Sequence, residues 1–344
     1  MKAAIVKEPG KLVIDDLPEP ELGPYDVLTD QLYGGVCAAT DQHLIAGELP
    51  IPGIAYPLIL GHESIGRVLD VGAKVRNLEV GDLVTRTGAP ALGGCQPFWG
   101  GFAELGIAKD VAAMKEDGLP EEDWAAHEIN LKLPPDFDPA AATMMITWRE
   151  THSYLRRLGV SPGDHVLVLG SGGNGFSFAV LAKAFGAGMV TMLGNPHWAE
   201  LAERAGVEAF ADYREPGAME TLRAASPDGY HVIVDSVGHT GGIEAAIPLL
   251  RAGGSVGLYG IEDIGERMGY LEKLGEQGIR VHGPGEYKEA EAHDAIVRLV
   301  QDGKLDAGIW FDPAAPTPLA RIGDAIDAIR AKRSLKAVVD LSAT

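Results

Sequence analysis

Apolar residues in the first part of the chain come in short runs that are typical of β-strands. Such runs occupy residues 3–6, 12–14 and 26–29. Pro18 and Pro24 lie between them, where proline marks turns or edge strands. No apolar repeat of helical length appears before residue 43. The pattern therefore predicts a β-rich N-terminal region.

From Val166 onward the pattern is that of alternating strands and helices. Four consecutive apolar residues, 166–169, indicate a strand that is buried on both faces of a parallel sheet. The small apolar residues 176–185 predict a helix directly after it. Further elements are expected as strands at 189–193, 230–238, 254–260 and 279–282, helices at 292–302 and 320–331, and a closing strand at 335–341. This order predicts an α/β fold with a doubly wound parallel sheet.

A glycine-rich turn joins the strand at 166–169 to its helix. Gly170, Gly172 and Gly175 fit G-x-G-x-x-G, and Gly173 and Asn174 complete the turn. The three glycines would serve a tight turn, the close approach of a pyrophosphate, and close helix–strand packing. The N-terminus of the helix would add N–H groups and partial positive charge. The alternative is a glycine-rich turn that binds nothing, but the strand–turn–helix order favours dinucleotide binding.

Composition narrows the class of protein. The 344 residues are 46% hydrophobic and 23% charged, as in a globular protein of two domains. A net charge of −20 argues against nucleic acid or an anionic membrane as partner, which leaves a small-molecule substrate. We expect neither a membrane span nor a signal peptide. Two cysteines, Cys37 and Cys95, form no disulfide framework, so we expect a cytoplasmic protein.

Two segments of the β-rich region concentrate reactive side chains. Cys37, Thr40 and His43 lie within seven residues, and His62 and Glu63 interrupt an apolar strand. Taken singly, Cys37 could be a small buried hydrophobe, His62 a hydrogen-bonded core histidine, and His43 an exposed loop residue. Glu63, however, is hard to bury without a cation. Thiolate, imidazole and carboxylate are together the ligands of catalytic zinc.

These motifs, taken in order, resemble the zinc-containing medium-chain dehydrogenase/reductase family. They are Cys37, Gly61-His62-Glu63, Gly81-Asp82-Leu83-Val84 and the turn at 170–175, and their spacing matches over nearly the whole chain. The resemblance implies an alcohol, polyol or sugar dehydrogenase that uses NAD(P) and zinc. Zinc would polarise the alcohol oxygen, and the nicotinamide would take the hydride.

The resemblance also implies an architecture. A GroES-like β-barrel catalytic domain would comprise residues 1–145 and 290–344, and a Rossmann dinucleotide-binding domain residues 146–289. Members of the family suggest a homodimer or homotetramer.

One catalytic zinc ion is expected, held by Cys37, His62 and Glu63. A structural zinc is not expected, because only Cys95 lies in the region 85–115, where relatives carry a four-cysteine lobe. One extra residue stands between Cys37 and Thr40, so either the loop bulges or the thiol is displaced.

The family's later zinc ligand falls within residues 145–147, where no good ligand stands. Glu150 lies about one helical turn further on and Thr147 is at the position itself, so which of them completes the site stays open.

Other roles follow from the resemblance alone. Thr40 would relay a proton from the substrate hydroxyl, His43 would form the outer end of that relay, and Asp41 would orient His62. The residues facing the nicotinamide would be Val237, Gly260 and Ile261.

The choice between NAD and NADP depends on the end of the strand at 189–193. NAD-specific relatives carry an acid there for the ribose 2′-hydroxyl, whereas this chain has Gly194 and Asn195. The absence of an acid permits a 2′-phosphate and favours NADP slightly.

Two further segments bear on the substrate. The polar residues 147–152, within a helix expected at 140–155, would line a wet cleft or form an exposed helical face, with Thr151 assigned to the cofactor. The acidic insertion within 109–133 is interpreted as a solvated surface loop. Both features favour a hydroxyl-rich substrate.

Three functions are compatible with the sequence. The first is a zinc-dependent alcohol, polyol or sugar dehydrogenase, and the second a zinc-free NADPH-dependent enone or quinone reductase on the same scaffold. The third is a non-catalytic nucleotide-binding protein, which intact glycines and relay residues disfavour.

Overall fold

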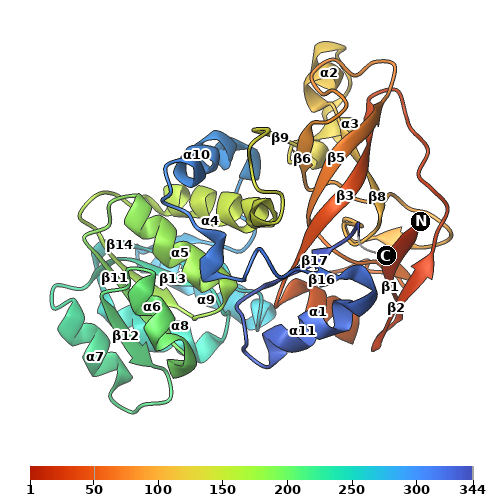
Figure 1. Cartoon of the computed structure of the whole chain (residues 1–344). Coiled ribbons are helices and arrows are strands. Elements are labelled where there is room, and N and C mark those ends of the chain that lie inside the picture. The colour runs from red at the N-terminus through yellow and green to blue at the C-terminus, as the bar shows by residue number, and fades with distance from the viewer. Residues whose placement is uncertain (50, 343–344) are drawn as a thin grey trace. The chain divides into compact units, whose positions relative to one another are not determined.

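The computed structural model describes residues 1–49 and 51–342, which form two compact units (Figure 1). One unit comprises Met1–Ile146 with Asp306–Thr344, and the other Thr147–Leu305. In the described residues, every helix is too short or too polar to cross a membrane.

The first unit is built on two β-sheets. The four-stranded sheet has the order β2-β1-β4-β7, and the larger has the order β16-β17-β3-β5-β6-β9, with β8 paired to β3. The strands are β1 (Lys2–Glu8), β2 (Lys11–Asp16), β3 (Asp26–Val36), β4 (Leu58–Ile59), β5 (Glu63–Val71), β6 (Leu83–Thr85), β7 (Gln96–Pro97), β8 (Leu105–Lys109), β9 (Lys132–Leu133), β16 (Thr317–Pro318) and β17 (Ala337–Asp340). The helices are α1 (Thr40–Ala46), α2 (Val111–Glu116), α3 (Glu121–Trp124), α11 (Ile322–Arg330) and the 3₁₀ turns η1 (Ala125–His127), η2 (Ala141–Met144), η5 (Ala307–Ile309) and η6 (Leu319–Arg321).

Period-two burial explains these strands. In β3, every second residue from Val27 to Gln31 is buried, so one face of the strand points into the core. The amphipathic helix α11 buries Ile322, Ile326 and Ile329 against residues of β1, β3 and β17. The β-rich N-terminal region is thus confirmed, and the closing strand β17 pairs with β3 in the same sheet.

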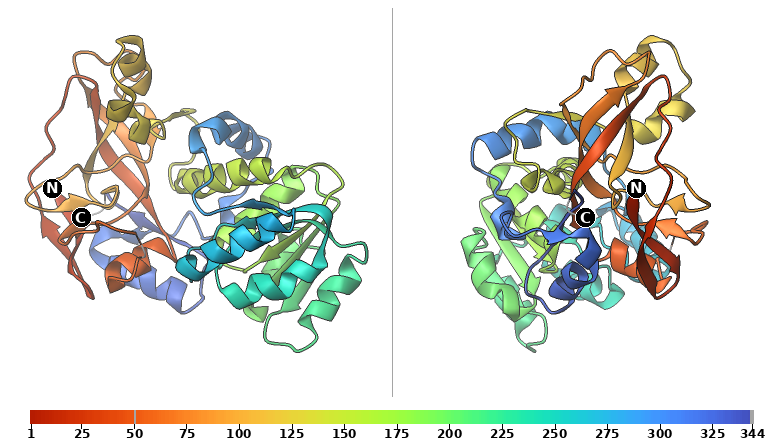
Figure 2. Two further views of the ribbon diagram at one scale, coloured as in Figure 1. Left: turned by 180° about the vertical axis from the view of Figure 1, so that it is seen from behind. Right: turned by 45° about the vertical axis from the view of Figure 1, so that its right-hand side comes forward.

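The second unit is a six-stranded parallel sheet with helices on both faces (Figure 2). Its order β12-β11-β10-β13-β14-β15 is that of the doubly wound dinucleotide-binding fold, which confirms the predicted fold class. The strands are β10 (His165–Leu169), β11 (Met189–Gly194), β12 (Ala209–Asp212), β13 (Tyr230–Asp235), β14 (Leu250–Leu258) and β15 (Arg280–His282). The helices are α4 (Met145–Leu158), α5 (Gly173–Ala184), α6 (Ala199–Arg204), α7 (Ala218–Ala225), α8 (Thr240–Ala246), α9 (Ile264–Glu276), α10 (Glu289–Gln301) and the 3₁₀ turns η3 (Pro196–Trp198) and η4 (Ile247–Leu249).

The structure groups residues 290–305 with the second unit, whereas the sequence analysis assigned them to the catalytic domain. The cause is α10, which packs within that unit. Glu289 at its start accepts a hydrogen bond of 3.1 Å from Arg149 of α4, and His293 lies 3.4 Å from the same guanidinium. These buried contacts attach α10 to the dinucleotide-binding unit.

The acidic insertion forms a small helical subdomain rather than a loop. It contains helices α2 and α3. Ala113 and Met114 of α2 pack against Tyr25, which lies outside the insertion. Asp117 accepts hydrogen bonds from Tyr25 at 2.8 Å and from Arg76 at 3.0 Å. The acidic side chain of Asp117 thus pairs with a cation in addition to meeting solvent.

Candidate active site

Strands β3 and β5 bring the thiol to the imidazole and carboxylate. They are antiparallel, with Gly35 opposite Glu63, so Cys37 just after β3 lies beside the start of β5. Gly35 has no space for a side chain, because a Cβ there would lie 2.7 Å from Glu63 Oε2. Gly61 has a φ of +98°, which favours glycine immediately before His62.

Cys37, His62 and Glu63 form a compact buried triad. One ligand atom from each, a sulfur, a ring nitrogen and a carboxylate oxygen, lies within 4.8 Å of the other two. Cys37 and His62 are each 8% exposed as whole residues, and Glu63 is 3% exposed. His62 Nε2 lies 3.9 Å from Glu63 Oε1. This donor set, soft sulfur with imidazole and carboxylate, suits zinc.

Asp41 contacts the Cys37 backbone and faces the His62 ring. It is fully buried, and its Oδ2 accepts a hydrogen bond of 2.8 Å from the Cys37 backbone N–H. Its Oδ1 lies 3.4 Å from His62 Nδ1, which leaves Nε2 for the side of the triad. Residues 38 and 39 form the turn before α1, so the extra residue is accommodated there while the thiol stays in the triad.

Lys336, which the sequence pattern did not mark as a site residue, supplies a positive charge to this site. It precedes β17, is 2% exposed, and its Nζ donates to both carboxylate oxygens of Glu63. The cation that a buried Glu63 requires is therefore present in the protein itself. A lysine within the apolar segment 335–341 was the available signal, because lysine is almost never buried without a partner.

The charges shift the pKa values of the triad. Burial raises the pKa of the Cys37 thiol. The hydrogen bond from His62 and the charge of Lys336 lower that pKa by more, so the net shift is downward. Burial lowers the pKa of His62, and the Asp41 carboxylate outweighs it and raises the pKa well above 6.5. Burial also lowers the pKa of Lys336, but the charge of Glu63 raises that pKa by more, so the net shift is upward. In the metal-free protein the site thus favours a thiolate beside a protonated imidazole. The thiolate is the form that binds metal, whereas His62 would have to release its proton to become a ligand.

Thr40 and His43 both belong to α1. Thr40 is its first residue and His43 follows three positions later, so the two occupy one face of the helix. The same helix carries Asp41, which joins these residues to the triad.

The glycines of the dinucleotide turn show three distinct environments. Gly170 has a φ of +105°, which a tight turn requires. A Cβ on Gly175 would lie 2.1 Å from the Gly170 carbonyl oxygen, so the helix approaches the strand closely there. A Cβ on Gly172 would meet nothing within 4 Å, so open space adjoins the turn. Gly173 and Asn174 begin α5, whose first N–H groups face the turn.

Asn195 and Gly194 lie at the end of β11, beside this turn. The Asn195 N–H donates to Ser171 Oγ at 2.8 Å, and Asn195 Oδ1 accepts from the His197 N–H at 3.1 Å. A Cβ on Gly194 would lie 2.5 Å from the Ser171 Cβ. The glycine is therefore needed for packing, and a side chain at 194 would displace Ser171.

Val237, Gly260 and Ile261 follow β13 and β14 at the carboxyl edge of the sheet. The side chain of Val237 is 38% exposed. A Cβ on Gly260 would lie 2.1 Å from the Val237 carbonyl carbon, so the two loops touch through their backbones. Ligands of open parallel sheets bind at this edge.

The polar residues of α4 do not line a wet cleft, and that expectation is wrong. Thr147, Arg149 and Thr151 are at most 1% exposed. Arg149 pairs with Glu289 of α10, and the Thr151 hydroxyl lies 2.6 Å from Ser177 Oγ of α5 while donating to the Thr147 carbonyl. Glu150 accepts a hydrogen bond of 2.7 Å from the Tyr259 hydroxyl. The polar groups therefore pair inside the second unit.

Comparisons with known proteins identify dehydrogenase domains and dehydrogenase relatives of this chain. Residues 23–121 match the model of the alcohol dehydrogenase GroES-like domain, and residues 175–301 match that of the zinc-binding dehydrogenase. An alcohol dehydrogenase of Rhizobium meliloti (strain 1021) is 30% identical over 91% of this chain and 98% of its own length. A sorbitol dehydrogenase of Bacillus subtilis (strain 168) is 24% identical over 89% of this chain and 87% of its own.

Solved structures share the fold over the whole chain. An alcohol dehydrogenase from Thermus sp. ATN1 aligns with a TM-score of 0.78 at 21% identity, covering 99% of both chains. A putative zinc-binding dehydrogenase from Sinorhizobium meliloti 1021, solved bound to NADP, aligns at 0.77 with 23% identity over 98% of both. The first unit thus includes the predicted GroES-like domain, and the chain belongs to the zinc-type medium-chain dehydrogenase family of oxidoreductases.

Proposed function

We propose that this chain is a zinc-dependent dehydrogenase that transfers a hydride between a nicotinamide dinucleotide and a hydroxyl-rich secondary alcohol, such as a polyol or sugar. The observation that carries the proposal is the buried triad of Cys37, His62 and Glu63, whose ligand atoms lie within 4.8 Å of one another. A glycine turn with open space beside Gly172 supplies the dinucleotide site.

Cys37, His62 and Glu63 would hold one zinc ion. When bound, the ion would act as a Lewis acid that polarises the substrate oxygen and lowers its pKa. Asp41 would keep the His62 ring oriented, because its carboxylate faces Nδ1 at 3.4 Å. Lys336 holds Glu63 in the protein itself, so this carboxylate would serve as an intermittent ligand rather than a constant one.

Thr40 and His43 would carry the proton away. A hydroxyl can accept a proton on one lone pair while donating its own, and an imidazole exchanges protons with water near neutral pH. Their positions three residues apart on α1 support a relay from the substrate hydroxyl toward solvent.

The cofactor's ribose would lie at the end of β11, and we propose NADP as the preferred form. No acidic side chain stands at Gly194 or Asn195 to repel a 2′-phosphate. Asn195→Asp tests this without entering the packed space at Gly194, because a carboxylate can also accept the His197 N–H. We expect kcat/KM to fall about tenfold or more for NADP and much less for NAD, by like-charge repulsion. Equal losses for both cofactors would place the ribose elsewhere.

A hydroxyl-rich substrate is supported by the relatives. Several similar proteins are named sorbitol dehydrogenase or D-xylulose reductase, at 24% to 28% identity. The direct test is initial rates of NADP and NAD reduction with a panel of polyols, sugars and linear primary alcohols. We expect the highest kcat/KM on a vicinal diol or polyol. No turnover of any alcohol in zinc-loaded protein would contradict the proposal.

The second candidate is a zinc-free NADPH-dependent reductase of enones or quinones. The observation that favours it is the Lys336–Glu63 pair, which satisfies the buried carboxylate without metal. This candidate predicts NADPH oxidation by a quinone at full rate after exhaustive chelation. The zinc-dependent proposal predicts that chelation abolishes alcohol oxidation.

A further inference from the structure

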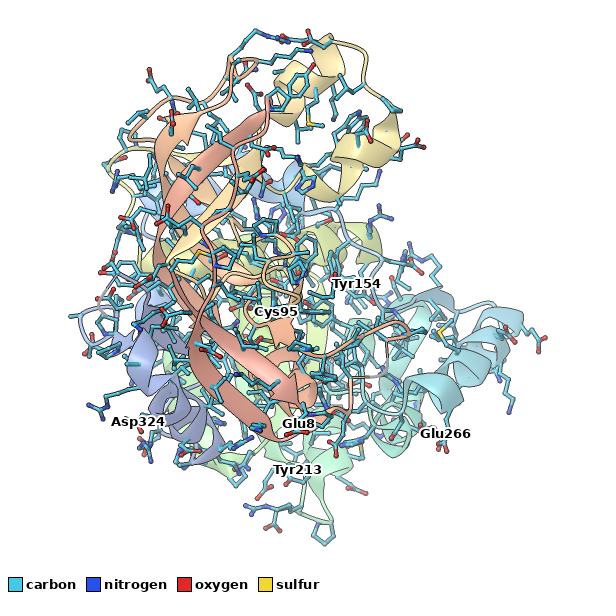
Figure 3. All side chains as sticks on the ribbon, turned by 90° about the vertical axis from the view of Figure 1, so that its right-hand side faces the viewer. Glu8, Cys95, Tyr154, Tyr213, Glu266 and Asp324 are labelled. Atoms are coloured by element: carbon cyan, nitrogen blue, oxygen red, sulfur yellow. The ribbon has the colours of Figure 1, made fainter. Side chains whose placement is uncertain are left out.

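A buried arginine connects the two loops at the carboxyl edge of the parallel sheet. Arg267 lies on α9 and is 2% exposed, whereas its neighbour Glu266 is exposed on the same helix (Figure 3). The Arg267 guanidinium donates to the carbonyl oxygens of Gly260 at 2.6 Å and Glu262 at 3.2 Å. Its Nη2 also donates to Asp235 Oδ2 at 3.1 Å.

Asp235 extends the connection to the neighbouring loop. Its Oδ1 accepts hydrogen bonds of 3.0 Å from the N–H groups of both Val237 and Gly238. Its backbone carbonyl accepts hydrogen bonds from the backbone N–H groups of Tyr259 at 2.9 Å and Gly260 at 3.0 Å. The Arg267–Asp235 ion pair and its hydrogen bonds therefore join the loops after β13 and β14, in addition to the contact of 3.2 Å between His239 Nδ1 and Asp263 Oδ2.

The loops after β13 and β14 pack closely against Arg267. A Cβ on Gly238, whose φ is +111°, would lie 2.5 Å from Arg267 Nη1. Position 238 therefore has no room for a side chain, and the guanidinium lies against the backbone of the loop that carries Val237. The planar fork of arginine can bridge two carbonyls and a carboxylate at once, which the single ammonium of lysine cannot do in the same geometry.

Stability alone does not account for such a pair. Burial raises the pKa of Asp235 and lowers the pKa of Arg267, because it disfavours the charged form of each group. The attraction between the two charges offsets this cost of burial. Well-packed apolar residues commonly stabilise a fold as much as a buried ion pair does. What the pair provides is a fixed position for the loops it joins.

We propose that Arg267 is a positioning residue for the nicotinamide ring, acting through the backbone of residues 237–238 and 260–262. The proposal rests on the function proposed above and on the expectation, from the family resemblance, that Val237, Gly260 and Ile261 face the nicotinamide. Hydride transfer needs the ring held within a few tenths of an ångström of the productive position, so loosening these loops lowers the rate more than it weakens the binding of the adenosine half.

The test compares two ligands that differ only in the nicotinamide. Affinity for the reduced cofactor and for the matching ADP-ribose, with or without the 2′-phosphate, is measured by calorimetry on the full chain. We expect Arg267→Met to weaken cofactor binding about tenfold and lower kcat more, with ADP-ribose affinity changed less than about twofold. Arg267→Lys should show the same pattern to a smaller extent, and it provides the comparison if the methionine variant does not fold.

Arg149→Met is the matched control. Arg149 is also buried in the second unit and pairs with a carboxylate at 3.1 Å, but that carboxylate belongs to Glu289 of α10 and not to the loops after β13 and β14. Its loss of melting temperature should resemble that of Arg267→Met, while the ratio of cofactor to ADP-ribose affinity stays at the wild-type value. Equal weakening of both ligands in the Arg267 variants would overturn the positioning role. Wild-type protein that binds neither ligand would overturn the proposed function itself.

Discussion

A buried carboxylate needs a positive partner, and Glu63 has one in Lys336. Both side chains are at most 4% exposed, so removal of the ammonium takes away the cation that pairs with the buried Glu63 carboxylate. The pair links β17 near the C-terminus to the start of β5. Lys336 is therefore the residue through which the closing strand contributes to the site.

We expect Lys336→Met to lower the free energy of unfolding of the metal-free protein by about 3–5 kcal/mol. Zinc should restore part of that loss, because an ion that binds the folded state supplies the missing charge. Urea unfolding with and without zinc measures both effects. Lys11→Met is the control, since Lys11 pairs with Glu8 at the surface and such pairs contribute about 1 kcal/mol or less. A metal-free Lys336→Met as stable as wild type would contradict this account.

His152 gives the fold a pH dependence. Burial, followed by the charge of Arg156, lowers the pKa of this ring from 6.5 to about 4. The folded state thus favours neutral His152, so its stabilising contribution is present above pH 6.5 and is lost as the pH falls toward 4. The loss is roughly 3 kcal/mol at most. Urea unfolding at pH 7 and pH 4.5 should show a smaller pH effect in His152→Asn than in wild type, and an equal effect would contradict the lowered pKa.

At the residue scale, chemistry was predictable where several reactive types gathered in a short segment. Cys37, His62 and Glu63 lie together as the donor set suggested, because two adjacent polar residues in an apolar strand have few other uses. Lys336 was missed because it lies 273 positions from its partner, and no local pattern shows such a pairing.

At the scale of elements, the strand–turn–helix around β10 and α5 was predictable from local sequence alone. Its signals are the four apolar residues of β10 and the three glycines of the turn. Gly170 has a positive φ, Gly175 leaves no room for a side chain, and Gly172 adjoins open space. The burial of α4 was not predictable, because Arg149 and Thr151 find their partners on α10 and α5. A polar helical segment therefore predicts an exposed face only where no other element supplies partners for its polar side chains.

Gly172→Val tests the function of the glycine turn. The open space beside Gly172 means that valine should fit the fold and lower the free energy of unfolding by less than about 1 kcal/mol. The same side chain would occupy the volume that a pyrophosphate needs, so cofactor affinity should fall at least about tenfold. Calorimetric titration with NADPH and NADH, beside urea unfolding, separates the two effects. Unchanged affinity for both would remove the turn from the cofactor site.

At the scale of the whole molecule, each unit carries one of the two candidate sites. The triad, Asp41 and Lys336 belong to Met1–Ile146 and Asp306–Thr344, and the glycine turn to Thr147–Leu305. The fold class followed from the alternation of elements, whereas the boundary near residue 305 was not marked by any change of composition. Helix α10 lies in the second unit, where Glu289 pairs with Arg149 of α4. Loss of the metal site should therefore leave dinucleotide binding intact.

The most direct test of the zinc-dehydrogenase account is metal content and turnover of wild type and Cys37→Ser, measured side by side. A serine hydroxyl is a far poorer zinc ligand than a thiolate, so the variant should lose most of its zinc and most of its alcohol oxidation. Its affinity for the nicotinamide cofactor should stay at the wild-type value. We predict about one zinc per wild-type chain. Wild type that is fully active without metal, or a variant that keeps both zinc and rate, would contradict the account.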